Sequence, residues 1–212
     1  MSEAPPLLKA LAIGKQFPGV RALHDVNLTL FQGEVLSLVG ENGAGKSTMM
    51  KILAGIHLPD EGAIELDGDF VEISNVREAQ KYGIALIHQE LNLSDNLDIA
   101  ANIFLGNEPH KSGIIDRNRI HKESAQFLKR VGLEFSTDTL VADLTIGHQQ
   151  LVEISKALSV DARIIIMDEP TSSLSQKESE KLFDVIQDLK SQGISIISVS
   201  YTHLTLPTIY SV

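Results

Sequence analysis

The sequence predicts an α/β fold organised around a mainly parallel β-sheet, and three observations carry that prediction. A strand-like run, Val35–Val39, breaks into a glycine-rich turn that opens into a helical segment at Lys46. The run Ile164–Met167 is apolar throughout, which is typical of parallel strands covered on both faces of a sheet. Strand-like and helical segments also alternate along the chain, and this order implies right-handed crossovers between parallel strands.

The composition is that of an ordinary globular protein. Its 212 residues fit one large domain, or one domain with an inserted subdomain. The chain has no cysteine, which excludes disulfides and thiolate metal sites, and its net charge of −10 argues against a nucleic-acid partner. The polar, acidic start at Met1–Pro6 is unlike a signal peptide, and no apolar run approaches the roughly 18–20 residues that span a bilayer. We therefore expect a soluble, cytosolic chain that reaches a membrane only through a partner.

The first half of the chain predicts short strands, turns and two helices. The helix that starts at Lys46 should stop at Gly55 and Pro59. Ser74 can cap a second, short helix that ends at Gly83. Apolar or alternating runs between turn residues indicate strands at Leu8–Ile13, Val26–Leu30, Val35–Val39, Ile64–Asp69 (into an Asp-Gly hairpin turn) and Ile84–Gln89.

From about residue 95 to residue 160 the sequence lacks strand patterning. Apolar residues recur there at helical spacing, so we expect a helical insertion. After the run Ile164–Met167, the pattern Ser175-x-x-Glu178 is a capping box that starts another helix. That helix should end at Gly193, before a strand at Ile194–Val199.

The glycine-rich turn has the spacing Gly40-x-x-x-x-Gly45-Lys46-Ser47, which is that of a phosphate-binding P-loop. Its glycines let backbone N–H groups approach a polyphosphate, and the helix that follows points its positive end at the same anion. Lys46 would reach the β- and γ-phosphates, and the Ser47 hydroxyl would ligate Mg²⁺. The alternative is a simple glycine turn followed by a lysine, but the strand before it and the helix after it favour a nucleotide site. The residues expected to hold the nucleotide are Gly40, Glu41, Asn42, Gly43, Ala44, Gly45, Lys46, Ser47 and Thr48.

Two carboxylates, Asp168 and Glu169, end the apolar run Ile164–Met167. An acidic residue at the carboxyl edge of a strand that faces a P-loop can hold the Mg²⁺ shell. A second carboxylate beside it can orient and polarise an attacking water. Two acids can also simply end a strand, but next to a P-loop we interpret Asp168 as a metal ligand and Glu169 as a catalytic residue.

With Asp168-Glu169-Pro170-Thr171-Ser172 added to the P-loop, the chain resembles the ATP-binding subunit of an ABC transporter. More narrowly, it resembles the first nucleotide-binding half of the tandem ATPases that drive monosaccharide importers of the ribose, galactose and xylose type. The resemblance covers roughly residues 7–199. It implies a P-loop NTPase fold of the ABC type, in which a mainly parallel core is joined by an N-terminal antiparallel β subdomain and a helical insertion. We therefore expect a nucleotide-binding domain at residues 1–200, with a helical subdomain at about 95–160.

Two further site residues are implied by the resemblance alone. Phe17 resembles the aromatic residue that stacks on adenine, and the alternative is an aromatic residue of the core. Gln89 resembles the glutamine that senses Mg²⁺ and the attacking water, so it would serve both as a metal ligand and in catalysis. The alternative for Gln89 is a surface polar residue that ends a strand.

The segment Leu144–Gln150 resembles the ABC signature. In that role Thr145, Gly147 and Gln149 would grip the γ-phosphate of ATP bound to an opposing ATPase half, at a helix N-terminus suited to an anion. The common Ser, Gly and Gln of the motif are replaced by Thr, Ile and His, which we interpret as a mark of the sugar-importer subfamily. Without the resemblance, this segment is an ordinary helix start.

The chain departs from the family pattern at two other places. Ser175 stands where many ABC proteins have an aspartate that contacts the opposing half, so only its role as a helix cap is expected here. Tyr201 occupies the position of the family's switch histidine, and we do not transfer that role to His203. Residues 201–212 contain neither charge nor glycine, and we expect this tail not to be native to the family.

The resemblance implies an ATPase that binds Mg·ATP, closes face to face with a second ATPase half and drives sugar uptake through a membrane permease. Lys46, Glu169 and Gln89 would carry catalysis, with ATP and Mg²⁺ as cofactors. An extracytoplasmic sugar-binding protein would be an indirect partner, and the subunit would lie on the cytoplasmic face of the cell membrane. Two other interpretations stay open. One is a truncated module that binds ATP without turnover, and the other is a soluble ABC ATPase acting on ribosomes or DNA.

Overall fold

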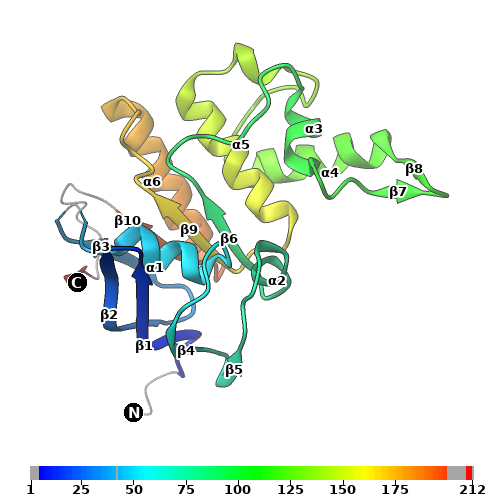
Figure 1. The fold of residues 1–212 in the computed structure, drawn as a ribbon. Coiled ribbons are helices and arrows are strands. Elements are labelled where there is room, and N and C mark those ends of the chain that lie inside the picture. The colour runs from blue at the N-terminus through cyan, green and yellow to red at the C-terminus, as the bar shows by residue number, and fades with distance from the viewer. Residues whose placement is uncertain (1–4, 42, 200–208, 212) are drawn as a thin grey trace. The chain divides into compact units, whose positions relative to one another are not determined.

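The computed structural model describes residues 5–41, 43–199 and 209–211. The chain forms two compact units, whose elements are labelled in Figure 1. The first unit comprises Met1–Leu86, Arg163–Glu169 and Asp188–Val212, and the second unit comprises Ile87–Ala162 and Pro170–Gln187. Among the described residues, no helix has both the length and the apolar character that a membrane span requires.

An antiparallel sheet forms one layer of the first unit. Its four strands lie in the order β2-β1-β4-β5. The turn between the last two strands is Asp67-Gly68, and both residues have positive φ, as a tight hairpin turn with an Asp-Gly pair requires. The strand bounds are β1 (Leu8–Phe17), β2 (Val20–Leu30), β4 (Glu61–Leu66) and β5 (Asp69–Val71).

The first strand is longer than the sequence predicted. We expected it to end at Ile13, but β1 continues to Phe17. Register shifts against β2 and β4 and a positive φ at Ala12 interrupt the alternating pattern without ending the pairing. Such bulges break the apolar/polar alternation, so a strand that continues past them cannot be recognised from that pattern.

A mainly parallel sheet is the second layer of the first unit, with the strand order β11-β3-β10-β9-β6 (Figure 1). The pairs β3–β10 and β10–β9 are parallel, as predicted, and β11 adds a parallel pair with β3 in the tail, where no strand was predicted. All of Ile164–Met167 is fully buried, which explains why this strand shows no alternation. The bounds are β3 (Val35–Val39), β6 (Ile84–Ile87), β9 (Ile164–Asp168), β10 (Ser195–Val199) and β11 (Ile209–Ser211).

Two helices complete the first unit, α1 (Lys46–Leu53) and α2 (Val76–Lys81). The core joins apolar side chains of both sheets to the inward face of α1, including Met50 and Ile52. The predicted cap of α2 is wrong by one residue, because Asn75 and not Ser74 accepts the Glu78 N–H, at 3.0 Å. Ser74 instead donates its N–H and its hydroxyl to the Glu78 carboxylate.

The second unit is mainly helical, and the helical subdomain at about 95–160 stays a prediction. Helices α3, α4 and α5 pack against one another through buried apolar residues such as Ile103, Leu128 and Leu151. The expectation of no strand in this region is wrong in one detail, since β7 (His110–Lys111) and β8 (Ile114–Ile115) form a hairpin. Strands of two residues are too short for an alternating pattern to show. The helices are α3 (Ile99–Phe104), α4 (Arg117–Arg130), a 3-10 turn (Val141–Asp143), α5 (Ile146–Ser159) and α6 (Gln176–Ser191), of which the part up to Gln187 belongs to this unit.

Candidate functional site

The P-loop connects β3 to α1 in the first unit. Gly45 caps the helix with a left-handed φ of 85°, and Gly43 has a φ of 84°. The first bond within the helix runs from the Met49 N–H to the Gly45 carbonyl, at 2.9 Å. The first N–H groups of an α-helix have no acceptor within the helix, so those of Ser47 and Thr48 lie at the positive end of the helix dipole.

Gly45 is required by packing as well as by backbone conformation. A Cβ at this position would lie 2.4 Å from the Ala22 carbonyl oxygen and 2.6 Å from Leu23 Cδ2. Both contacts come from β2, so the antiparallel sheet directly supports the start of α1. Gly43 differs, because a Cβ there would meet no atom within 4 Å.

Lys46 is only 5% exposed although it carries a charge. Its Nζ donates to the carbonyl oxygens of Gly40, at 2.6 Å, and Glu41, at 2.8 Å. These are the carbonyls of the loop itself, so the ammonium lies folded back over the P-loop. A buried lysine held by neutral carbonyls can exchange them for phosphate oxygens, which attract it more strongly.

The structure brings the acid pair to the P-loop. Ser47 Oγ lies 3.4 Å from Asp168 Oδ1, although the two residues are 121 positions apart in the chain. Asp168 is the last residue of β9, and Ser47 belongs to the first turn of α1. A hydroxyl and a carboxylate oxygen beside a helix N-terminus form the donor set that Mg²⁺ accepts when it also binds phosphate, so these residues fit Mg·ATP.

Glu169 follows Asp168 in a strained conformation, with a φ of 47°. Its N–H donates to the Val199 carbonyl at 2.9 Å, which holds the turn against β10. Burial raises the pKa of the Glu169 carboxyl, the Asp168 charge raises it further, and Lys46 opposes both effects. A carboxylate with a raised pKa is a better general base than an ordinary surface glutamate, and strain of this kind often marks functional positions.

Phe17 ends β1 in the first unit and is half-buried. Its ring packs edge-to-face against His57, with centroids 5.3 Å apart, and Lys15 Nζ lies 5.7 Å from its centroid. The His57 contact has no sequence signal, because Phe17 ends β1 whereas His57 follows α1, far along the chain. Adenine stacking by Phe17 stays a prediction.

The other predicted site residues lie elsewhere or outside the described part. Asn42 lies outside the described residues, as do Tyr201 and His203. Gln89 is exposed and belongs to the second unit. Its predicted roles in metal binding and catalysis stay predictions.

The signature residues also belong to the second unit, at the start of α5. Thr145 caps this helix by accepting the His148 N–H at 3.3 Å. Gly147 is the second residue of the helix and is buried. Gln149 Nε2 donates to the carbonyls of Val141 and Leu144, so its amide supports the preceding loop.

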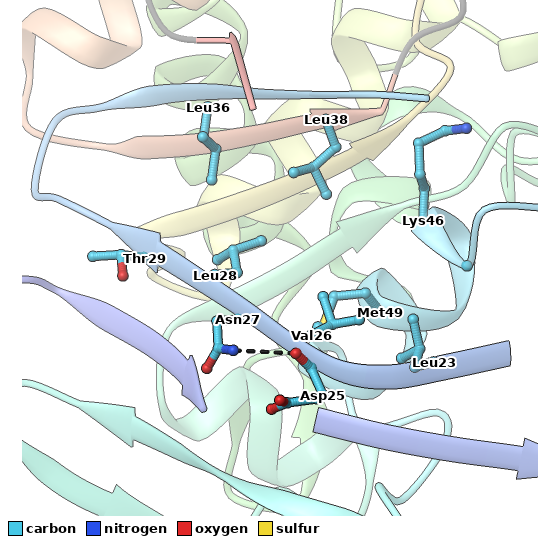
Figure 2. A pocket seen from close by; sticks show the side chains of 11 residues that line it. Leu23, Asp25, Val26, Asn27, Leu28, Thr29, Leu36, Leu38, Lys46 and Met49 are labelled. Carbon is cyan, nitrogen blue, oxygen red and sulfur yellow. Dashed lines mark hydrogen bonds between the residues drawn. The ribbon is translucent and has the colours of Figure 1, made fainter. Parts of the chain in front are cut away.

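A cavity of about 440 Å³ lies beside the P-loop helix in the first unit (Figure 2). Its apolar wall comes from β2, β3 and α1, and Figure 2 shows Leu28, Leu36 and Leu38 around it. Asn27 Nδ2 donates to the Asp25 carbonyl at its polar rim, at 3.1 Å. No sequence pattern indicated this cavity, because it arises where the two sheets meet.

Comparison with known proteins is consistent with this geometry. The family model described as ABC transporter matches residues 23–172. The ribose import ATP-binding protein RbsA of Clostridium perfringens (strain 13 / Type A) is 48% identical over 203 residues, which cover 95% of this chain and 40% of that protein. The RbsA protein of Caldanaerobacter subterraneus subsp. tengcongensis is 51% identical over 92% of this chain and 40% of its own length. A putative ribose/galactose/methyl galactoside import ATP-binding protein of Burkholderia lata is 49% identical over 93% of this chain and 39% of its length.

The chain thus spans about 40% of the length of these curated relatives.

Solved structures agree on the fold. An ATP-binding cassette of an ABC transporter in its ADP conformation has a TM-score of 0.86 at 23% identity and covers 98% of this chain and 87% of its own. A nucleotide-free cassette has a TM-score of 0.84 at 24% identity, over 93% of this chain and 82% of its own. The predicted α/β fold is confirmed by these likenesses.

The two P-loop glycines provide a matched pair of substitutions. Gly45→Ala should lower the free energy of unfolding by roughly 2–4 kcal/mol, because a left-handed alanine would also collide with the Ala22 backbone. Gly43→Ala should cost only about 1 kcal/mol, since it meets the conformational penalty alone. Urea unfolding of both variants measures the difference. Equal losses would contradict the packing of Gly45 against β2.

Proposed function

The chain belongs to the ABC transporter family, and from this premise we propose that it is an ATP-hydrolysing subunit that energises sugar import through a membrane permease. The observation that carries the proposal is the contact between Ser47 and Asp168 beside a buried Lys46. Relatives named as ribose or ribose/galactose import ATP-binding proteins support sugar as the cargo. Because the chain spans about 40% of those relatives, its activity, substrate and partners are all part of the proposal.

Each residue has a defined task in this proposal. Lys46 exchanges the Gly40 and Glu41 carbonyls for phosphate oxygens and neutralises their charge. The N–H groups at the start of α1 hold the same phosphates in place. Ser47 and Asp168 would hold Mg²⁺, which supplies positive charge to the phosphates when bound.

Glu169 is the residue best placed to act on water. Its raised pKa lets it accept a proton, and its left-handed backbone is held by the hydrogen bond from its N–H to the Val199 carbonyl. Gln89 would assist Glu169, and Phe17 would stack on the adenine ring. These two assignments rest on the family resemblance.

We further infer the partners from family membership and from the relatives' names. A second ATPase half would receive the signature residues Thr145 and Gly147, and permease subunits would hold the protein at the cytoplasmic face of the membrane. An extracytoplasmic sugar-binding protein would deliver the cargo to the permease. The absence of basic arms and the net charge of −10 fit a partner other than a nucleic acid.

Lys46→Met tests nucleotide binding. We expect ATP affinity to fall by about 10- to 100-fold, because a hydrogen bond to a charged group contributes roughly 1.5–3 kcal/mol. Lys51→Met, in the last turn of the same helix, is the matched control and should bind as the unaltered chain does. Isothermal titration calorimetry with Mg·ATP measures both. The proposal fails if the two variants bind equally well.

Glu169→Gln separates hydrolysis from binding. Phosphate release should fall by at least ~100-fold, the lower end of what a positioned general base contributes, while ATP affinity stays within about threefold. Glu72→Gln, an exposed carboxyl after β5, is the control and should hydrolyse normally. Steady-state phosphate release that is unimpaired in Glu169→Gln would remove the catalytic role of this residue.

A further inference from the structure

The Glu178 carboxylate joins the N-termini of two helices within the second unit. Its Oε2 accepts the Ser175 N–H at 3.0 Å and the Ser175 hydroxyl at 2.7 Å, at the start of α6. Its Oε1 accepts the Thr145 hydroxyl at 3.0 Å, at the start of α5. The Gly147 N–H is a further donor to the same carboxylate. One anion therefore satisfies donors from segments that lie about thirty residues apart in the chain.

The Glu178 side chain packs closely against Gly147. A Cβ at position 147 would lie 2.6 Å from Glu178 Oε1 and 2.7 Å from its Cγ. The φ of Gly147 is not in the left-handed region, so the backbone conformation does not demand a glycine here. A larger residue at position 147 would therefore force the Glu178 side chain to move.

The electrostatics favour a permanently charged carboxylate. The pKa of Glu178 is lowered to about 2, first by the Ser175 hydroxyl, then by the Ser175 N–H and the Thr145 hydroxyl. Two helix dipoles also direct their positive ends at this group. The neighbouring titratable groups are His148 on α5, whose pKa is lowered by burial and by Lys181, and Lys181 itself on α6. Glu178 is thus anionic throughout the physiological range.

We propose that Glu178 is a positioning residue that ties the segment Thr145–Gln149 to the start of α6 and fixes the directions of the Thr145 hydroxyl and the Gly147 N–H. The inference rests on the proposed function, in which this segment contacts ATP on an opposing half. Ser175 closes the six-residue stretch that follows Glu169 in the sequence. Glu178 therefore connects the signature segment to the stretch of the same chain that follows Asp168 and Glu169.

Amide hydrogen exchange of Glu178→Gln tests the link without any nucleotide. At pH 7 we expect peptides covering residues 144–150 to exchange at least ~10-fold faster than in the unaltered chain, because a charge-assisted anchor is lost. Peptides of α4 should exchange at the same rate within about twofold. Glu180→Gln, an exposed glutamate on the same helix, is the matched control and should change nothing at residues 144–150.

Two results would overturn the proposal. One is unchanged exchange at residues 144–150 in Glu178→Gln. The other is a uniform increase across the whole second unit, which would show that Glu178 only contributes to general stability.

A carboxyl titration followed by ¹³C NMR provides a second readout. Glu178 should titrate near 2 in the unaltered chain, and Thr145→Val should move its midpoint up toward the usual 4.5, because a hydroxyl donor is lost. Thr145→Ser keeps the hydroxyl and should keep the low midpoint. A midpoint near 4.5 in the unaltered chain, or one that Thr145→Val leaves in place, would contradict the link.

The same pKa predicts the sign of an effect on stability. Because the folded-state pKa is depressed, the contribution of Glu178 is fully present above about 4.5 and is lost as the pH falls from there toward 2. Protection of residues 144–150 should fall over that range. Failure to bind ATP in the unaltered chain would count against the proposed function and would leave these readouts unaffected, since none of them uses nucleotide.

Discussion

The contact between Ser47 and Asp168 is the constraint on which the proposed site depends, and strand register is what creates it. On β10, Val199 pairs with Leu38 of β3 on one side and with Asp168 of β9 on the other. The carboxyl ends of β3 and β9 therefore lie level, although the two strands are not neighbours. The P-loop leaves one of these ends and the acid pair closes the other. A slip in either pairing would separate the hydroxyl from the carboxylate.

Two glutamates nine positions apart in the chain, Glu169 and Glu178, are given opposite chemistry by their surroundings. Burial and the Asp168 charge raise the pKa of Glu169, which suits proton transfer. Hydrogen bonds from Ser175 and Thr145 lower the pKa of Glu178, which suits a fixed structural charge. The first would act on the reacting water and the second on the geometry of the signature segment. The same type of side chain thus serves a different task at each position, and the neighbouring groups decide which one.

Features that depend on neighbouring residues could be predicted from the sequence, whereas contacts between distant residues could not. The apolar run Ile164–Met167 indicated a buried parallel strand, and the Ser175–Glu178 capping box was correct because both partners lie within one helical turn. The bond from Glu178 to Thr145 could not be predicted, since it depends on how α5 and α6 fold together. The role of Gly147 in anion binding stays a prediction, and the structure adds its close contact with Glu178. At α2, Ser74 and Asn75 are both good caps, and only the structure shows which one is used.

A double-mutant cycle on Mg·ATP affinity tests the central claim most directly, with Ser47→Ala, Asp168→Asn and the two combined. If both side chains serve one magnesium-bound nucleotide, each single change should weaken binding by about 10-fold and the double variant should lose little more than either, because interacting residues are not additive. If the losses simply multiply, to roughly 100-fold, the two residues act independently, and the convergence of the P-loop and the acid pair on one ligand is contradicted.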